Sequence, residues 1–161
     1  MDITVRPAKK EDHPAVERLL RQIAQLHANL LPEIFRPASQ KYDAQQFAAM
    51  LGDPNAPILV AQDEHGEVLG YAILQVKIVG ENYPVLLPRT FLYLDDLCVD
   101  VDARGQGIGS LLMQGVRELA KSRGIEKIEL NVWECNEGAM RFYERLGFTT
   151  QRRGLEMDVG L

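Results

Sequence analysis

The fold is decided by the segment Leu97–Ser110, LCVDVDARGQGIGS, in which an apolar strand leads through a glycine-rich turn into an amphipathic helix. Gly105, Gly107 and Gly109 alternate after Arg104 in this turn. Because glycine has no Cβ, backbone N–H groups in such a turn can approach a ligand closely. The helix N-terminus adds unpaired N–H donors and the positive end of the helix dipole. The segment therefore predicts a diphosphate site, against the alternative of a tight turn that only needs flexible residues.

The glycine spacing narrows the class of phosphate ligand. The dinucleotide fingerprint is G-x-G-x-x-G at the first strand-to-helix turn, whereas this chain has G-x-G-x-G late in the sequence. An ATP-type loop needs G-K-[ST], which does not follow these glycines. The pattern therefore excludes an ATP-type loop and disfavours a dinucleotide-binding oxidoreductase.

Hydrophobic periodicity on either side of this segment predicts one mixed α/β (α+β) domain over residues 1–161. Strands are expected at residues 3–7, 58–61, 68–79, 90–99, 128–133, 148–151 and 155–159. Helices are expected at residues 12–30, 42–51, 107–123 and 136–147. No internal repeat indicates a second domain.

Composition restricts the partners. The chain has 161 residues with 18 basic and 23 acidic side chains, a formal net charge of −5. Nucleic acids and anionic membranes attract basic surfaces, so neither is an expected partner. Cys98 and Cys135 form no C-x-x-C pair, no apolar leader opens the sequence, and no apolar run reaches membrane-spanning length. These features predict a reduced, cytoplasmic protein.

A second informative segment is Asn131–Phe148, NVWECNEGAMRFYERLGF. Asn136 is a suitable N-cap for a helix, and Gly147 is suited to end it. Tyr143 follows Asn136 by seven residues, two turns along the same side of the helix. Taken alone, this tyrosine is better explained as an amphipathic core residue whose hydroxyl finds one partner.

The two segments together resemble a known family. Arg104–Gly109, RGQGIG, is similar to the R/Q-x-x-G-x-G/A signature of the GNAT superfamily of N-acetyltransferases, and the second segment is similar to that family's N-x-x-A-x-x-F/L-Y-x-x-x-G-F. The resemblance implies the GNAT fold, with a mixed, twisted central sheet of about seven strands flanked by about four helices. It also implies a V-shaped splay between the strands at 90–99 and 128–133.

The resemblance implies acetyl-CoA as the co-substrate and no metal. In the family the glycine loop holds the pyrophosphate of CoA, the strand before it meets the pantetheine arm, and the tyrosine returns a proton to the CoA thiolate. Carried over, the cofactor-binding residues are Leu97, Cys98, Val99, Arg104, Gly105, Gln106, Gly107, Ile108, Gly109, Ser110, Asn136, Tyr143 and Arg145. Direct attack by the amine is the family expectation, so Cys98 is not expected to be a nucleophile.

Asp95 and Asp96 are adjacent carboxylates in an apolar strand, where burial is costly unless they are satisfied or used. Alternation predicts that they face opposite sides of the sheet, and one of them could simply bond a loop. The stretch Tyr93–Leu97, YLDDL, also resembles the corresponding strand of polyamine N-acetyltransferases. By that resemblance, Asp95 or Asp96 binds a cationic amine and assists its deprotonation. Asn131 stands where some members have a glutamate base.

These features predict an acetyl-CoA-dependent N-acetyltransferase acting on a small cationic amine or polyamine, with Tyr143, Asp95 and Asp96 as catalytic residues. Acetylation of a protein N-terminus or lysine, and a CoA-binding regulatory module without turnover, stay open. A homodimer is common in the family. The regions of His27, Phe35 and Tyr83 line the acceptor pocket in that family, although the position of His27 near its helix end favours a solvated or capping role.

Overall fold

The structure is a computed structural model that describes all 161 residues. Its contacts divide the chain into two compact units, Met1–Asn131 and Val132–Leu161. The first unit contains the whole sheet and three α-helices, and the second contains a single α-helix.

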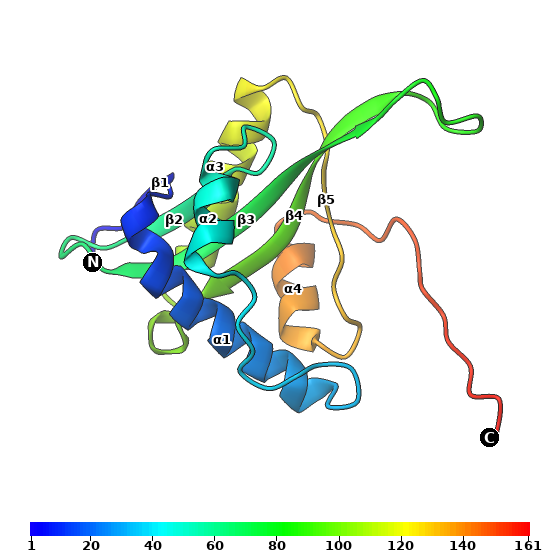
Figure 1. Ribbon diagram of the computed structural model, residues 1–161, viewed down its shortest axis with the longest axis horizontal. Helices are drawn as coiled ribbons and strands as arrows, with labels where there is room; N and C mark the ends of the chain where they lie inside the picture. Colours follow the sequence, from blue (N-terminus) through cyan, green and yellow to red (C-terminus); the bar gives the residue numbers. More distant parts are fainter. The chain divides into compact units, whose positions relative to one another are not determined.

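The first unit is built on a five-stranded sheet whose strands lie in sequence order (Figure 1). The strands are β1 (Thr4–Pro7), β2 (Ile58–Gln62), β3 (Val68–Val79), β4 (Arg89–Val99) and β5 (Ile128–Leu130). Strands β1 to β4 pair antiparallel, whereas β5 runs parallel to β4. A parallel neighbour requires a crossover, and here the crossover contains a helix.

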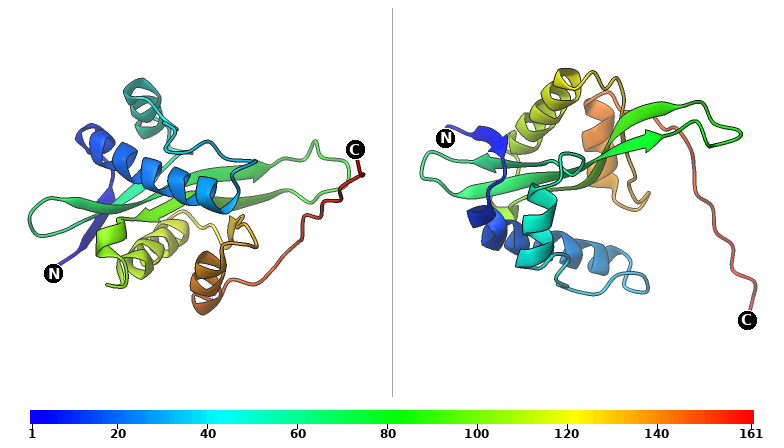
Figure 2. Two further views of the ribbon diagram at one scale, coloured as in Figure 1. Left: turned by 90° about the horizontal axis from the view of Figure 1, so that it is seen from below. Right: turned by 45° about the horizontal axis from the view of Figure 1, so that its top comes forward.

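Helices cover both faces of this sheet. Helices α1 (His13–Leu30) and α2 (Ala44–Leu51) lie on one face and α3 (Ile108–Ser122) on the other (Figure 2). Short 3₁₀ turns, η1 (Lys10–Asp12) and η2 (Val101–Ala103), precede α1 and α3. The core under α1 and α2 consists of Val16, Leu19, Leu20, Phe47, Ile58, Val60, Val68, Tyr71, Ile73 and Cys98. Alternation along the central strands supplies one apolar side chain to each face in turn.

Two features of β4 shape the region where the expected site lies. Its pairing with β3 shifts register, because Ile73 lies opposite Asp96 while Leu74 lies opposite Leu94. Asp95 is therefore the extra residue of a β-bulge. Pairing with β5 is confined to residues 92–94 of β4, so residues 95–99 continue beyond the last β5 partner. β4 thus continues past the end of β5, at the place where the splay is expected, and β5 ends at Leu130 instead of at residue 133.

The second unit contains α4 (Glu137–Arg145) and no strand. The prediction of strands at 148–151 and 155–159 is wrong, so the sheet has five strands and not about seven. A strand persists only when its backbone groups pair with a neighbour. The alternation of Leu155, Met157 and Val159 describes one amphipathic face but supplies no partner, and all three side chains are exposed.

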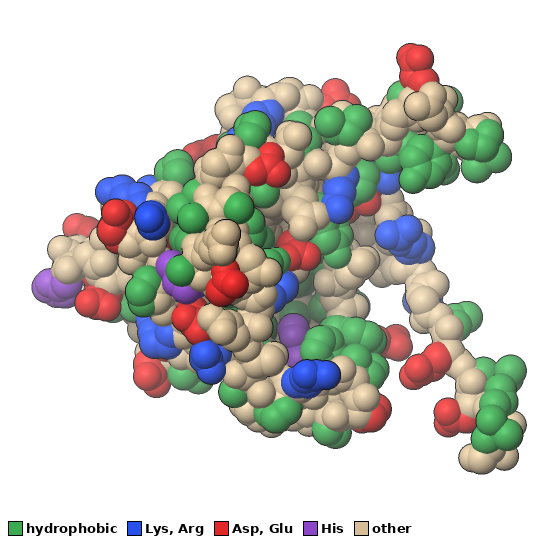
Figure 3. Space-filling view, in the orientation of Figure 1, with side chains coloured by type: hydrophobic (Ala, Val, Ile, Leu, Met, Phe, Trp, Pro, Cys, Tyr) green, Lys and Arg blue, Asp and Glu red, His purple; other side chains and the backbone are tan.

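No helix in the structure has the length and apolar character that a membrane span requires. On the face drawn in Figure 3, acidic and basic side chains are interspersed and do not gather into one large patch of a single sign. The surface drawn therefore has no extended basic stripe of the kind that tracks a phosphate backbone.

Candidate functional site

The glycine-rich turn connects the end of β4 to α3. Arg104 is extended, whereas Gly105 and Gly107 have φ of 77° and 81°, a region that other residues enter only at a cost. A Cβ built on either glycine would meet no atom within 4 Å. Packing therefore does not require glycine here. The positive φ angles of the two residues require glycine, and the space in front of both residues is open.

The amides that follow are those of a helix N-terminus. The first helical bond is donated by the Leu111 N–H to the Gly107 carbonyl at 3.0 Å, so the N–H groups of residues 108–110 precede the helical ladder. Ile108 buries its side chain in the core and offers only its backbone, while Gln106 is exposed. Nε of Arg104 donates to the Val99 carbonyl at 3.1 Å, which holds this cation at the end of β4. Open space, amide donors and an arginine together fit a diphosphate.

Asp100 fastens this turn to α1. Its buried carboxylate pairs with Arg18 and accepts hydrogen bonds from the Asp102 N–H at 3.2 Å and from Nε2 of Gln22 at 3.4 Å. Burial alone would raise the pKa of Asp100, but the hydrogen bond from Arg18, with those from the Asp102 amide and Gln22, holds it below the usual value. The carboxylate is therefore a fixed anion that keeps the end of β4 against α1.

Residues 97–99 of β4 pair with β3 along one edge, and the other edge lies beyond the last β5 partner. An extended ligand can add to such an edge through main-chain hydrogen bonds. The Cys98 side chain points into the α1 core, with Sγ 3.5 Å from the Leu19 carbonyl. Burial, with the nearby charge of Asp96, raises the pKa of the Cys98 thiol to about 12, which disfavours the thiolate that a nucleophile requires.

Both aspartates of the β-bulge converge on one ammonium group. Nζ of Lys41 lies 3.3 Å from Oδ2 of Asp95 and 3.0 Å from Oδ2 of Asp96. The prediction that the two carboxylates face opposite sides of the sheet is therefore wrong. The bulge places an extra residue at Asp95 and interrupts the strict alternation of the strand.

Two phenols complete this acidic cluster, which we define as Asp95 and Asp96 with Lys41, Tyr42 and Tyr71. The Tyr42 hydroxyl donates to Oδ2 of Asp95 at 3.3 Å, and the Tyr71 hydroxyl donates to Oδ1 of Asp96 at 3.2 Å. The Asp95 and Asp96 side chains keep 24% and 12% of their surface exposed, so solvent reaches both carboxylates. Both also bond a loop, which the sequence offered as the alternative explanation for one of them.

The cluster fixes the charge of its members. Burial disfavours the ammonium form of Lys41, yet the charges of Asp96 and Asp95 outweigh it and raise the pKa of Lys41. Burial also raises the pKa of Tyr71, and Asp96 adds to that increase. At neutral pH Lys41 is therefore an ammonium group, and Tyr42 and Tyr71 are protonated phenols.

His27 lies in the last turn of α1 and is half-buried, with its ring 4.9 Å from the ring of Phe35. Burial lowers the pKa of His27, and the opposing effect of Asp96 does not compensate for it. His27 therefore packs on Phe35, and its backbone carbonyl accepts the C-cap N–H of Leu31 at 2.8 Å. Tyr83 is exposed in the connection between β3 and β4.

Sequence reasoning did not identify Lys41, Tyr42 or Tyr71. The only local signal for the first two is their place directly before Asp43, which caps α2 by accepting from the Gln46 N–H at 2.8 Å. Nothing in the pattern around Tyr71 distinguishes it from an ordinary core aromatic residue, because its hydroxyl partner comes from β4.

The second unit presents the expected tyrosine on α4. Asn136 caps the helix by accepting from the Ala139 N–H at 3.2 Å, as its sequence position predicts. The half-buried Tyr143 ring packs edge-on against Phe142 and Phe148, with ring centroids 5.2 and 5.6 Å away. Gly147 follows the helix with φ of 93°, and Arg145 lies in the last helical turn.

In the first unit, Asn131 donates through Nδ2 to the Tyr93 hydroxyl at 3.2 Å.

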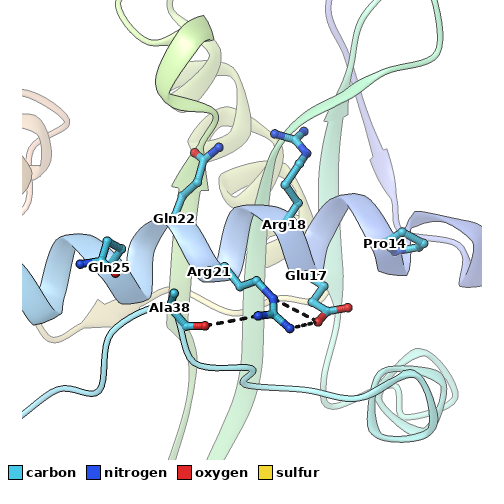
Figure 4. A pocket seen from close by; sticks show the side chains of 7 residues that line it. All are labelled: Pro14, Glu17, Arg18, Arg21, Gln22, Gln25 and Ala38. Atoms are coloured by element: carbon cyan, nitrogen blue, oxygen red, sulfur yellow. Dashed lines mark hydrogen bonds and ion pairs between the residues drawn. The ribbon is translucent and has the colours of Figure 1, made fainter.

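A surface hollow lies along the outer side of α1 (Figure 4). It is lined by Pro14, Glu17, Arg18, Arg21, Gln22, Gln25 and Ala38. Its arginines are already engaged, because Arg18 pairs with Asp100 while Arg21 pairs with Glu17 and reaches the Ala38 carbonyl at 3.4 Å.

Comparison with known proteins gives consistent matches. The model of the acetyltransferase (GNAT) family matches residues 20–148. The thialysine N-epsilon-acetyltransferase of Bos taurus is 29% identical over 147 residues, which cover 90% of this chain and 83% of that protein. The mycothiol acetyltransferase of Propionibacterium freudenreichii subsp. shermanii is 31% identical over 92% of this chain, which corresponds to 44% of that longer protein. The crystal structure of a tetramutant of the BH1408 protein from Bacillus halodurans has a TM-score of 0.90 at 30% identity, covering 97% of this chain and 99% of that one.

Proposed function

The chain belongs to the GNAT family of acetyltransferases, and from that premise we propose that it transfers an acetyl group from acetyl-CoA to the primary amine of a small cationic acceptor. One observation carries the proposal. Two carboxylates at the bulge of β4 converge on a single ammonium group, that of Lys41. The cluster is therefore built to bind an alkylammonium ion, which is the charged form of a primary amine.

The glycine turn is the proposed cofactor site. Acetyl-CoA supplies the activated acetyl thioester when bound. Its diphosphate would be held by Arg104 and by the backbone N–H groups of residues 105–110, with the open space before Gly105 and Gly107 receiving it. The pantetheine arm would add along the unpaired edge of β4, at Leu97, Cys98 and Val99. The resemblance to the family is the support for Asn136, Tyr143 and Arg145 as further proposed cofactor-binding residues.

The acidic cluster is the proposed acceptor site. An alkylamine has a pKa near 10, so at neutral pH it arrives as an ammonium ion and must lose a proton before it can attack. Asp95 and Asp96 would bind this ion and take its proton, directly or through water. A backbone N–H near Leu97 would donate to the developing oxyanion. By the family resemblance, Tyr143 would return a proton to the departing thiolate.

A lysine-type ε-amine is the second candidate acceptor, and a specific contact favours it. The ammonium group that the cluster binds in the structure is itself a lysine ε-ammonium. The Bos taurus relative is named for the acetylation of such a nitrogen in thialysine. The candidates therefore range from free amino acids with a terminal amine to lysine residues of a peptide.

The two free cysteines agree with the proposed reducing, cytoplasmic setting.

The experiment is a measurement of CoA-thiol release from acetyl-CoA with a panel of acceptors. The panel contains spermidine, thialysine, L-lysine, an aminoglycoside and a lysine-containing peptide, with the uncharged analogue Nα,Nε-diacetyl-lysine amide as the control. Acetyl-CoA-dependent turnover of a cationic amine supports the proposal. Tight binding of acetyl-CoA without turnover of any cationic amine would count against it.

A further inference from the structure

Lys41 occupies the position that the proposed function assigns to the acceptor ammonium group. It belongs to residues 31–43, the connection between α1 and α2, which contains neither helix nor strand. Its Nζ reaches both Asp95 and Asp96, so a single ammonium group of this chain engages both acceptor carboxylates.

The approach of Lys41 is supported by the residues that follow it in the chain. The next residue, Tyr42, donates its hydroxyl to Asp95, and its ring lies 5.4 Å from Nζ of Lys41. Asp43 then caps α2 through a capping box with Gln46. Because the following residues are anchored, the lysine has fewer conformations to lose when it pairs, and it competes as an intramolecular ligand at high effective concentration.

The Lys41 side chain stays 42% exposed. Its stem and head can therefore move into solvent without unpacking the core. Each carboxylate also has a second partner, because the fully buried Tyr71 donates to Asp96 from β3 and Tyr42 donates to Asp95. The cluster thus has a fixed anionic part on β4 and a displaceable cation on the connection.

We propose that Lys41 is a specificity-determining residue, whose ammonium group must be displaced from Asp95 and Asp96 before the acceptor ammonium group can bind. This inference rests on the proposed function of the acidic cluster. With Lys41 in place, the two carboxylates and one ammonium group leave a single net negative charge. Displacing Lys41 costs binding free energy. An acceptor with a single cation and few other contacts therefore binds more weakly than an acceptor whose further cations or contacts offset that cost.

Competition of this kind changes binding and not chemistry. Once the acceptor has displaced Lys41, the same two carboxylates face it as in a protein without the lysine. Removal of the charge therefore lowers the acceptor KM and leaves kcat nearly unchanged. A lysine that assisted catalysis would lower kcat on removal, and one that bound the acceptor would raise KM.

The test compares Lys41→Met, which keeps the length and loses the charge, with Lys41→Arg, which keeps the charge. Lys121→Met in the last turn of α3 is the control for loss of a surface lysine. With spermidine and thialysine as acceptors, we expect KM to fall about tenfold in Lys41→Met, with kcat within about twofold of the wild type. Lys121→Met should keep the wild-type KM, whereas Lys41→Arg, which keeps the competing cation, should not lower it. An unchanged or higher KM in Lys41→Met would overturn the inference.

A second measurement does not depend on turnover. Brief treatment with acetic anhydride, followed by peptide mass spectrometry, reports how accessible each lysine amine is. Spermidine should accelerate the labelling of Lys41 relative to Lys121, because displacement releases its ammonium group into solvent. Unchanged or slower labelling of Lys41 would overturn the inference. Failure of the proposed acceptor site is recognised separately, since Asp95→Asn and Asp96→Asn would then leave the acceptor KM unchanged in both lysine backgrounds.

Discussion

Gly107→Asp separates the conformational role of the glycine turn from its role as an anion site. Gly107 has φ of 81° and ψ of 2° directly before α3. A side chain there meets no atom within 4 Å, so the substitution causes no clash. Its conformational cost is that of a left-handed backbone, about 1 kcal/mol. For a domain of this size, that cost lowers the unfolding temperature by roughly 2–4 °C.

The carboxylate adds an electrostatic effect only if a diphosphate binds at this turn. Two unit charges about 4 Å apart repel by about 4 kcal/mol at the effective dielectric constant of a protein surface. Solvent and salt reduce this value at an exposed turn. We therefore expect acetyl-CoA to bind at least about a hundredfold more weakly, which corresponds to about 2.7 kcal/mol.

Gly124→Asp is the matched control. Gly124 follows α3 with φ of 66°, and a Cβ there also meets no atom within 4 Å. Both variants should therefore show a similar loss in thermal unfolding, while isothermal titration should show weak acetyl-CoA binding only for Gly107→Asp. If Gly107→Asp bound acetyl-CoA with the affinity of Gly124→Asp, the diphosphate would not lie at this turn.

Three further outcomes can be checked with single variants. Asp100→Asn removes the pairing with Arg18 and should lower the free energy of unfolding by about 1–2 kcal/mol at pH 7. Because the folded-state pKa of Asp100 is depressed, this contribution is present above about pH 4 and is lost as the pH falls. In chemical unfolding, the loss of stability in Asp100→Asn should therefore be larger at pH 7 than at pH 3. A loss that does not depend on pH would argue against this role of Asp100. Cys98→Ala should keep kcat, because the thiol is protonated, and should lower stability by about 1 kcal/mol, because the thiol is buried. Complete loss of turnover in a folded variant would instead show that the thiol is catalytic. Tyr143→Phe should bind acetyl-CoA normally and lower kcat by about a hundredfold, and a wild-type kcat would remove its assigned role.

The sequence predicted the elements whose signals are local. The glycine turn lies between an apolar strand and an amphipathic helix, and each of these signals is contained within a few residues. The same holds for Asn136 at the start of α4 and Gly147 after its end. Caps and glycine turns depend on backbone geometry near the residue itself, which is why their positions can be recognised from one chain.

The acidic cluster could be predicted only in part, because its geometry depends on distant residues. The Asp95–Asp96 pair is visible in the sequence, but the bulge is a property of the register between β3 and β4. Lys41 precedes the pair by more than fifty residues and comes from a segment without regular structure. Alternation was therefore the wrong guide at this point, since a one-residue bulge redirects a side chain.

The two unformed strands had a different cause. Residues 148–161 have a strand-like pattern, but pattern alone does not provide a neighbour for the backbone groups. Strand formation depends on a partner that no local window contains. The expected number of strands was therefore too high, while the order of the remaining elements was correct.

The acceptor KM of Asp95→Asn and Asp96→Asn tests most directly whether the cluster on β4 binds the acceptor amine. The exposed Asp158→Asn, in the C-terminal segment, is the control for the loss of one negative charge. With acetyl-CoA saturating and spermidine or thialysine varied, either cluster variant should raise the acceptor KM about tenfold or more, while Asp158→Asn keeps the wild-type value. Wild-type acceptor KM values in both cluster variants, with turnover intact, would place the acceptor amine elsewhere and contradict the assignment.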